Sequence, residues 1–335
     1  MLERLSYVVC VGILFAFIIH KAKVEGETSP QVVVDIPHAR KHQLDGKGIV
    51  VAVIDEGFDP SHGSLKDKFS PYRYNTNNKT RDVSETIVFE NGAYQFESHG
   101  THVTGIITSL APQVEIIPIK IGGFGGDQAF VKALQMAATS LAHIVNISMR
   151  LSHTGRELSP NVRTALIQLA QADKVIVIAA GNESAPLMKH PYTASLVDLA
   201  HHPSMKGRLL LAGASSYKQG RETRAAFSNY PGQSAFGAAQ AYFLTAPGDH
   251  ITSTITGGAF GEKSGTSMAA PMIVGAASLL KQAFPCLDAQ ALVQLLLKSA
   301  RKVSLGGQDL PRTEFGAGII NLRSALEYGK VFLSS

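Results

Sequence analysis

The stretch GIVVAVIDEG, residues 48–57, decides the fold. Its first seven residues are apolar or glycine and rich in β-branched side chains, which is typical of a strand buried on both faces of a sheet. Asp55 follows at the carboxyl end, where open α/β sheets bind their ligands, and Gly57 permits a sharp turn. An aspartate after a strand is more often a turn or capping residue, so other segments must decide its role.

Further apolar runs predict four more strands, at residues 114–121, 143–149, 174–180 and 208–214. Pro118 predicts an edge or bent position, because proline cannot donate to a neighbouring strand. Apolar residues at helical spacing predict helices at residues 128–141, 161–172 and 268–284. Strands that alternate with helices pair in parallel through right-handed crossovers. The sequence therefore predicts an α/β fold, a three-layer sandwich with a mainly parallel central sheet.

The two ends of the chain differ from the predicted domain at residues 44–330. An uninterrupted apolar run at residues 7–19 suits the core of a signal peptide and is short for a membrane span. Residues 1–26 are thus predicted to be a signal peptide of an exported, periplasmic or extracellular protein, with an uncleaved membrane anchor as the alternative. Residues 27–43 are expected to form a linker or arm, and residues 331–335 a C-terminal tail.

The composition argues against several classes of protein. With 45% hydrophobic and 17% charged residues the chain is an ordinary globular protein. A net charge of +5 without a run of basic residues gives no support for nucleic-acid binding. The two cysteines, Cys10 in the leader and Cys286, cannot form a disulfide after processing or a structural zinc site alone. Cys286 is expected to be a partly buried apolar residue.

The segment SHGTHV, residues 98–103, precedes an apolar helical pattern. Two histidines three residues apart suggest a metal pair, but the HExxH arrangement is absent and no acidic third ligand stands at an evident spacing. His99, beside small residues at a helix start, suits a general base, and His102 is expected to be a packed histidine.

The segment SGTSMAAP, residues 264–271, is the most specific of the motifs. It places Ser267 at the start of a buried helix, where the backbone N–H groups favour negative charge. Pro271 in the first turn costs no internal hydrogen bond. The segment lacks the G-x-S-x-G pattern of α/β-hydrolases.

Together these motifs resemble the three signatures of subtilisin-like serine peptidases, in that family's order. The signatures are D-x-G at residues 55–57, H-G-T-H-V at residues 99–103 and G-T-S-M-A-x-P at residues 265–271. AAGN at residues 179–182 resembles the family's oxyanion segment, and FGAGIIN at residues 315–321 its closing motif. The matches span nearly the whole predicted domain.

The resemblance implies a serine endopeptidase that acts through an acyl-enzyme. Ser267 would be the nucleophile, His99 the general base and acid, and Asp55 the residue that orients the imidazole. The side-chain amide of Asn182 and the Ser267 N–H would hold the oxyanion.

The resemblance also implies how a protein or peptide substrate binds. It would add as an extra strand, because backbone pairing aligns a peptide regardless of most side chains. The flanking segments and the pocket would include Gly123, Gly125, Gly126, Ser148, Met149, Arg150, Ala180 and Gly181. Without the resemblance, the glycines at 123–126 would be read as a flexible turn.

Two residues depart from the family pattern at the site. Glu56 stands where Ser or Thr is usual, and either points to solvent or raises the pKa of neighbouring groups through its like charge. Arg150 stands where the family has Gly at the pocket rim, which suggests a bias towards acidic or small substrate side chains.

No cofactor and no metal are expected. The segment at residues 99–117 lacks the insertion that carries the strong calcium site of many relatives, and Ser64 replaces a calcium-binding Asp. The short linker at residues 27–43 leaves no visible folding pro-domain. The chain is therefore expected either to fold unaided or to use a separate helper or inhibitor.

Two other functions compete with the peptidase. An exported, inactive subtilase-like binding protein would need a defect in the catalytic set, and Glu56, Arg150 and the missing pro-domain keep that hypothesis open. A zinc hydrolase using His99, His102 and the pair at residues 201–202 is the more remote alternative, since that pair is expected in a loop before Pro203.

Overall fold

The structure of the protein is a computed structural model that describes residues 34–85, 87–90, 93–122, 126–152, 156–218, 221–302, 304–305, 308–309 and 312–334. The predicted leader at residues 1–26 and the predicted site residues Gly123 and Gly125 lie outside this part of the chain. Within it, none of the helices has the length and apolar character needed to cross a membrane.

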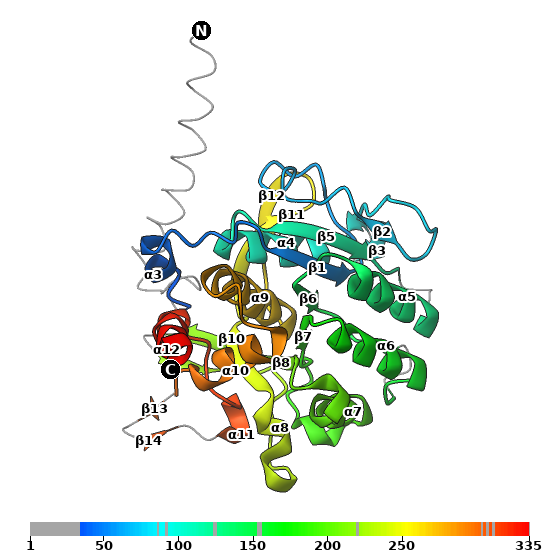
Figure 1. The fold of residues 1–335 in the computed structure, drawn as a ribbon. Coiled ribbons are helices and arrows are strands. Elements are labelled where there is room, and N and C mark those ends of the chain that lie inside the picture. Colours follow the sequence, from blue (N-terminus) through cyan, green and yellow to red (C-terminus); the bar gives the residue numbers. More distant parts are fainter. Residues whose placement is uncertain are drawn as a thin grey trace.

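An eight-stranded sheet forms the centre of the molecule (Figure 1). Its order is β10-β8-β7-β6-β1-β5-β2, with β9 paired to β8. All pairs along this order are parallel, and β9 is antiparallel to β8, so the prediction of a mainly parallel sheet is confirmed. The strands are β1 (Val50–Asp55), β2 (Tyr74–Asn75), β5 (Glu115–Lys120), β6 (Ile144–Ile147), β7 (Val175–Ala179), β8 (Leu209–Lys218), β9 (Arg221–Arg224) and β10 (Phe243–Pro247).

Helices cover both faces of this sheet, because side chains alternate between the faces along each strand. In β1, Val51 and Val53 pack into one buried cluster and Ala52 and Ile54 into another. The first cluster is covered by α4 (His99–Leu110), α9 (Thr266–Ala283), α10 (Ala289–Lys298) and α12 (Leu322–Ser334). The second is covered by α5 (Gly126–Thr139), α6 (Pro160–Gln171) and α7 (Pro191–His201). Figure 1 shows α9 and α5–α6 on opposite sides, which confirms the three-layer sandwich.

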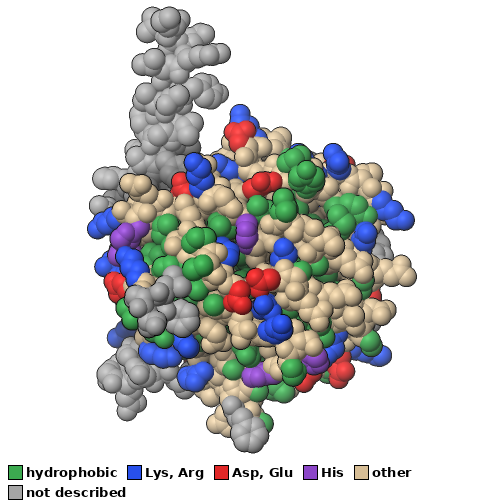
Figure 2. Space-filling view, viewed as in Figure 1, with side chains coloured by type: hydrophobic (Ala, Val, Ile, Leu, Met, Phe, Trp, Pro, Cys, Tyr) green, Lys and Arg blue, Asp and Glu red, His purple; other side chains and the backbone are tan. Residues whose placement is uncertain are grey.

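Smaller elements surround these layers, and basic and acidic side chains are both distributed over the face of the molecule seen in Figure 2. Three hairpins are formed by β3 (Ile87–Glu90) with β4 (Ala93–Phe96), β11 (Ile251–Ile255) with β12 (Ala259–Lys263), and β13 (Ser304–Leu305) with β14 (Gln308–Asp309). Short helices are α3 (Ile36–Lys41), α8 (Ala238–Ala241), α11 (Arg312–Phe315), η1 (Leu187–Lys189), η2 (Pro203–Met205) and η3 (Ala235–Gly237).

Both predicted domain boundaries move outward in the structure. Part of the predicted linker at residues 27–43 forms α3, whose Ile36 and Ala39 are buried in the main core. The Arg323 side chain of α12 donates to Asp35 at 2.6 Å, and α12 itself continues to Ser334 instead of ending in a tail at residue 331. The helices α3 and α12 contact each other and contribute buried side chains to the same apolar cluster, a long-range contact that local patterns do not reveal.

Three local expectations are corrected. Cys286 is exposed between α9 and α10, not partly buried. His201 is the last residue of α7 rather than part of a loop. Pro118 lies in β5, which is one strand in from the edge, but the outer neighbour β2 pairs only with Ile119 and Lys120. Proline is tolerated there because no partner strand requires its missing N–H.

The parallel arrangement brings several loops to one edge of the sheet. The carboxyl ends of β1, β6 and β7 adjoin along this edge, since these strands are neighbours in the same direction. Asp55 ends β1, Ser148 follows β6, and Ala180 follows β7. This edge is where a doubly wound fold places its ligands, and it carries the predicted motifs.

Candidate active site

Asp55 and His99 form a hydrogen-bonded pair at this edge. The Asp55 carboxylate is fully buried, and its Oδ1 lies 2.8 Å from His99 Nδ1. The Glu56 N–H donates to the same oxygen at 2.9 Å. His99 is the first residue of α4 and keeps 22% of its side chain exposed, so its other ring nitrogen can face a ligand.

Gly100 allows this close approach of α4 to the end of β1. A Cβ atom at position 100 would lie 2.1 Å from the Gly57 carbonyl oxygen and 3.0 Å from the Asp55 Cβ. Any larger residue would therefore push His99 away from the carboxylate.

Charges around His99 control its pKa. Burial acts to lower the pKa of His99, but the charge of Asp55, the hydrogen bond to it and the charge of Glu56 together raise the pKa above its ordinary value. Burial and the neighbouring Asp55 in turn raise the pKa of Glu56, which lines the cavity. Glu56 thus belongs to the electrostatics of the site.

Ser267 lies near the beginning of α9 and lines the same cavity as His99. Its hydroxyl donates to the Ser148 carbonyl at 2.9 Å, and the Ser148 hydroxyl donates back to the Ser267 carbonyl at 2.9 Å. The serine hydroxyl therefore points to the end of β6 in this state. A rotation about its Cα–Cβ bond would redirect it, and catalytic hydrogen bonds commonly tighten when substrate binds.

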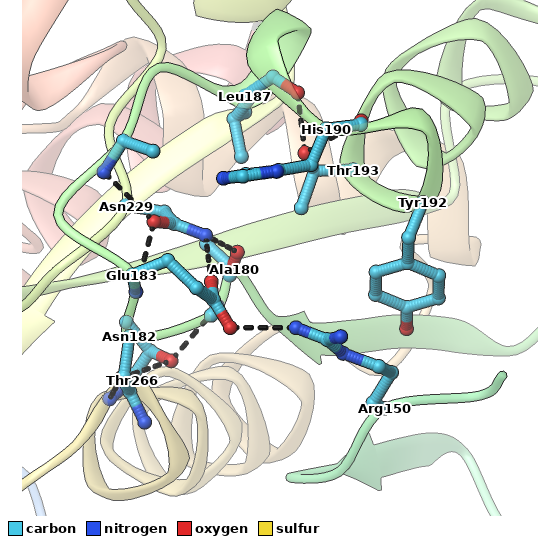
Figure 3. Close-up of polar contacts among 12 residues, drawn as sticks. Arg150, Ala180, Asn182, Glu183, Leu187, His190, Tyr192, Thr193, Asn229 and Thr266 are labelled. Atoms are coloured by element: carbon cyan, nitrogen blue, oxygen red, sulfur yellow. Dashed lines mark hydrogen bonds and ion pairs between the residues drawn. The ribbon is translucent and has the colours of Figure 1, made fainter. Parts of the chain in front are cut away.

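Asn182 is held by Thr266, the first residue of α9. Its carbonyl oxygen accepts from the Thr266 N–H at 2.9 Å and from the Thr266 hydroxyl at 3.0 Å (Figure 3). These two bonds engage the oxygen, so the amide nitrogen is the atom left to bind a ligand in the cavity.

The residues predicted to bind substrate are partly brought together. Ser148, Met149, Arg150 and Gly181 line a cavity of about 270 Å³ together with His99, Asn182 and Ser267. Ala180 is buried, and its neighbour Ala179 lines the cavity instead. Gly126 is the first residue of α5, with a φ angle of 57°.

Four residues that line or support this cavity are not predicted from the sequence. Tyr192 and Thr193, in the first turn of α7, line it, and Glu183 lies on its rim. Asn229 is buried behind the rim. Glu183 directly follows the AAGN motif, so its position could have been found, whereas nothing in the local sequence of the other three marks them.

A further carboxyl group, that of Glu85, interacts with the charge of Asp55. The Thr101 hydroxyl, which accepts from the Asp59 N–H at 2.8 Å, is hydrogen-bonded to Glu85 Oε1. Burial raises the pKa of Glu85 to about 7, and the charge of Asp55 acts in the same direction. Within the described part of the chain, Glu85 Oε2 and Asp55 Oδ2 are buried without a hydrogen-bond partner.

The histidines of the zinc hypothesis have separate partners. His102 is buried in α4, as predicted, and its Nε2 lies 3.0 Å from the Ile251 carbonyl oxygen and 3.1 Å from that of Gly261. Burial lowers the pKa of His102 to about 4. His201 Nε2 lies 2.8 Å from the Ala238 carbonyl oxygen. These contacts favour packing roles for both residues.

Comparison with known proteins agrees with this geometry. The model of the subtilase family, Peptidase_S8, matches residues 46–318. This chain belongs to the subtilase family. It is a serine protease, as are its similar relatives.

Among the relatives of this subtilase is an intracellular serine protease of Paenibacillus polymyxa, 27% identical over 308 residues, which cover 87% of this chain and 84% of that protein. Subtilisin Savinase of Lederbergia lenta is 27% identical over 304 residues, which cover 87% and 96% of the two chains. A cold-adapted subtilisin-like serine proteinase has the same fold, with a TM-score of 0.62 and 24% identity over 83% of this chain and 88% of that one.

Proposed function

We propose that this subtilase is an endopeptidase in which Ser267 is the nucleophile, His99 the general base and acid, and Asp55 the orienting carboxylate. Asn182 provides an oxyanion donor. The observation that carries the proposal is the 2.8 Å hydrogen bond between Asp55 and His99, since His99 lines the same cavity as Ser267 and Asn182.

Acylation begins when the Ser267 hydroxyl turns from the Ser148 carbonyl towards His99. Its oxygen attacks the carbonyl carbon of the scissile peptide bond while His99 Nε2 accepts the proton. Asp55 stabilises the resulting imidazolium, and the Asn182 amide and the Ser267 N–H stabilise the oxyanion. His99 then donates its proton to the leaving nitrogen, the C–N bond breaks, and an ester to Ser267 remains.

Deacylation uses the same groups. A water molecule gives a proton to His99 and attacks the ester carbonyl carbon, and the oxyanion again faces the Asn182 amide. Collapse of this intermediate breaks the bond to Ser267 Oγ, which recovers its proton from His99. The net reaction adds one water across one peptide bond.

A protein or peptide substrate would bind as an added strand between residues 123–126 and residues 148–150. The substrate side chain before the scissile bond would enter the cavity between Arg150 and Gly181. We also propose that the protein is exported through residues 1–26, or anchored to a membrane by them, and that a separate chain can act as its folding helper or inhibitor.

The test uses purified residues 27–335 and a fluorophosphonate probe, which reacts with an activated serine. We expect the parent protein to be labelled and Ser267→Ala to remain unlabelled, with a loss of about a millionfold in kcat, the size measured for a subtilisin. Ser264→Ala is a matched control in the same motif, whose exposed hydroxyl donates to Asp249 at 2.9 Å, and it should be labelled. An unlabelled but folded parent would support the inactive binding protein instead.

A further inference from the structure

An ion pair crosses the rim of the cavity. Arg150, on the loop after β6, donates from a guanidinium nitrogen to Glu183 Oε1 at 2.6 Å. The two side chains are 44% and 37% exposed. Figure 3 shows Arg150 reaching across to Glu183, with the Tyr192 ring beside it. The guanidinium carbon lies 5.4 Å from the centre of that ring. The arginine is therefore not a free cation, which weakens the expectation of a bias towards acidic substrates.

Glu183 is fixed from behind by Asn229. The Asn229 amide nitrogen donates to Glu183 Oε2 at 2.5 Å and to the Ala180 carbonyl at 2.9 Å. The Asn229 side-chain oxygen accepts from the Glu183 N–H at 3.1 Å and the Ala185 N–H at 3.0 Å. All four hydrogen-bonding positions of this buried amide are used, so the carboxylate is held in the wall of the cavity.

Gly181 makes room for that contact. Its φ angle is +100°, and a Cβ atom there would lie 2.5 Å from both the Asn229 amide nitrogen and Glu183 Oε2. Arg150 has no comparable support: among the described residues its charged group meets Glu183 and the face of Tyr192. Of the two partners, Arg150 is the one that can leave or be removed without disturbing the wall.

We propose that Arg150 is a specificity-determining residue that occupies the Glu183 carboxylate and thereby excludes basic substrate side chains. The inference rests on the proposed function, in which the side chain before the scissile bond enters this cavity. The charge of Arg150 would repel a lysine or arginine side chain of the substrate. The Glu183 carboxylate, which could pair with that side chain, is already bound to Arg150. An acidic side chain would meet the Glu183 charge. The pocket therefore favours uncharged side chains.

The proposal predicts two opposite switches. Arg150→Ala frees the Glu183 carboxylate, so kcat/KM for peptides with Lys or Arg before the scissile bond should rise about tenfold relative to Leu peptides, because a new hydrogen bond to a charged group forms. Glu183→Gln, which can keep a bond to Asn229, frees the Arg150 guanidinium and should raise the ratio for Glu peptides. The double variant should gain neither.

Arg163→Ala is the matched control. It removes the same charge from a surface ion pair, Arg163 to Asp198 at 2.5 Å, away from the residues that line the cavity. We expect it to leave the ratio between Lys and Leu peptides unchanged. Arg150→Gln, which retains length and hydrogen-bonding groups, should shift the ratio in the same direction as Arg150→Ala, and thermal unfolding verifies that each variant is folded.

A binding measurement separates this inference from the proposed function. Each substitution is combined with Ser267→Ala, and calorimetry measures the binding of tetrapeptide acids that end in Lys, Leu or Glu. If the parent cleaves no peptide, the proposed function fails, yet tighter binding of the Lys peptide to Arg150→Ala/Ser267→Ala would still support the role of Arg150. Unchanged preferences in binding and cleavage would overturn it, as would a parent that prefers Lys, or one that prefers Glu and loses this in Arg150→Ala.

Discussion

Two walls of the cavity that His99 and Ser267 line are built on different principles. On the wall of Asn182 and Glu183, one buried amide, Asn229, fills all its hydrogen-bonding positions and fixes the loop after β7. On the wall of His99 and Glu56, the carboxyl groups of Asp55 and Glu85 do not line the cavity themselves, and their buried oxygens Asp55 Oδ2 and Glu85 Oε2 have no partner among the described residues. The first wall provides fixed geometry, whereas the second has Glu85 nearby, whose raised pKa makes its charge depend on pH.

The largest expected effect concerns the fixed wall. Asn182→Ala should lower kcat by about 100- to 1,000-fold, the range measured for the equivalent loss in a subtilisin, because in the proposed mechanism it removes a donor to the developing oxyanion. KM should change little, since the donor acts mainly in the transition state. Steady-state kinetics with a peptide substrate measures both constants. A rise in KM at constant kcat would assign Asn182 to substrate binding instead.

Asn229→Ala tests whether the fixed wall depends on one side chain. It leaves the Ala180 carbonyl and the N–H groups of Glu183 and Ala185 without their partner. Because each buried unpaired group costs free energy, we expect the free energy of unfolding to fall by about 3–4 kcal/mol. Urea unfolding measures it.

Asn75→Ala is the control for this change. Asn75 is also buried, but its side chain makes two hydrogen bonds, to the Asp82 carbonyl and from the Asn77 N–H. Its loss should cost less. Equal losses of stability in the two variants would show that the wall does not depend specially on Asn229.

The buried carboxyl group of Glu85 should make the free energy of unfolding depend on pH. Burial raises the pKa of Glu85 from 4.5 to about 7, so the folded protein holds this proton at pH values where the unfolded chain has released it. Below pH 4.5, burial of the Glu85 carboxyl therefore does not lower the free energy of unfolding. Its contribution lowers this free energy as the pH rises towards 7, and the free energy stays lower above pH 7. The shift corresponds to about 3 kcal/mol.

Glu85→Gln should remove this penalty. The variant should therefore be more stable than the parent at pH 9, by up to about 3 kcal/mol, and gain much less at pH 4.5. Urea unfolding at both values checks it, with Glu115→Gln on the exposed start of β5 as the control. A stability difference that is the same at both pH values would contradict a buried, titrating Glu85.

The smallest expected effect concerns Glu56. Its charge helps to raise the pKa of His99, whereas Lys263 acts to lower it. Since His99 must be neutral to accept a proton, activity rises with pH through the pKa of His99. Glu56→Gln should move the acid limb of the kcat/KM profile to lower pH, and Lys263→Gln should move it to higher pH. If the acid limb stays at the same pH in both variants, Glu56 only faces solvent.

The sequence by itself determined the fold class and the main chemistry of this protein. Apolar, β-branched runs predict buried strands such as residues 50–55. The helical spacing of apolar residues predicts the amphipathic helix at residues 126–139. Ser267 and His99 stand in short motifs, because a helix start and its neighbouring small residues are local requirements. The predicted roles of these residues await the probe experiment.

Only the tertiary structure decided which side chains meet around the cavity. Asn229 reaches Glu183 across 46 positions of sequence, and Glu85 approaches Thr101 from a loop. Arg150 could be noticed as a departure from the family, but its pairing with Glu183 could not. Such contacts depend on where loops meet after the sheet has formed, and no periodicity records them. Burial and charge pairing, which set the pKa of Glu85 and the occupancy of Glu183, exist only once the chain has folded.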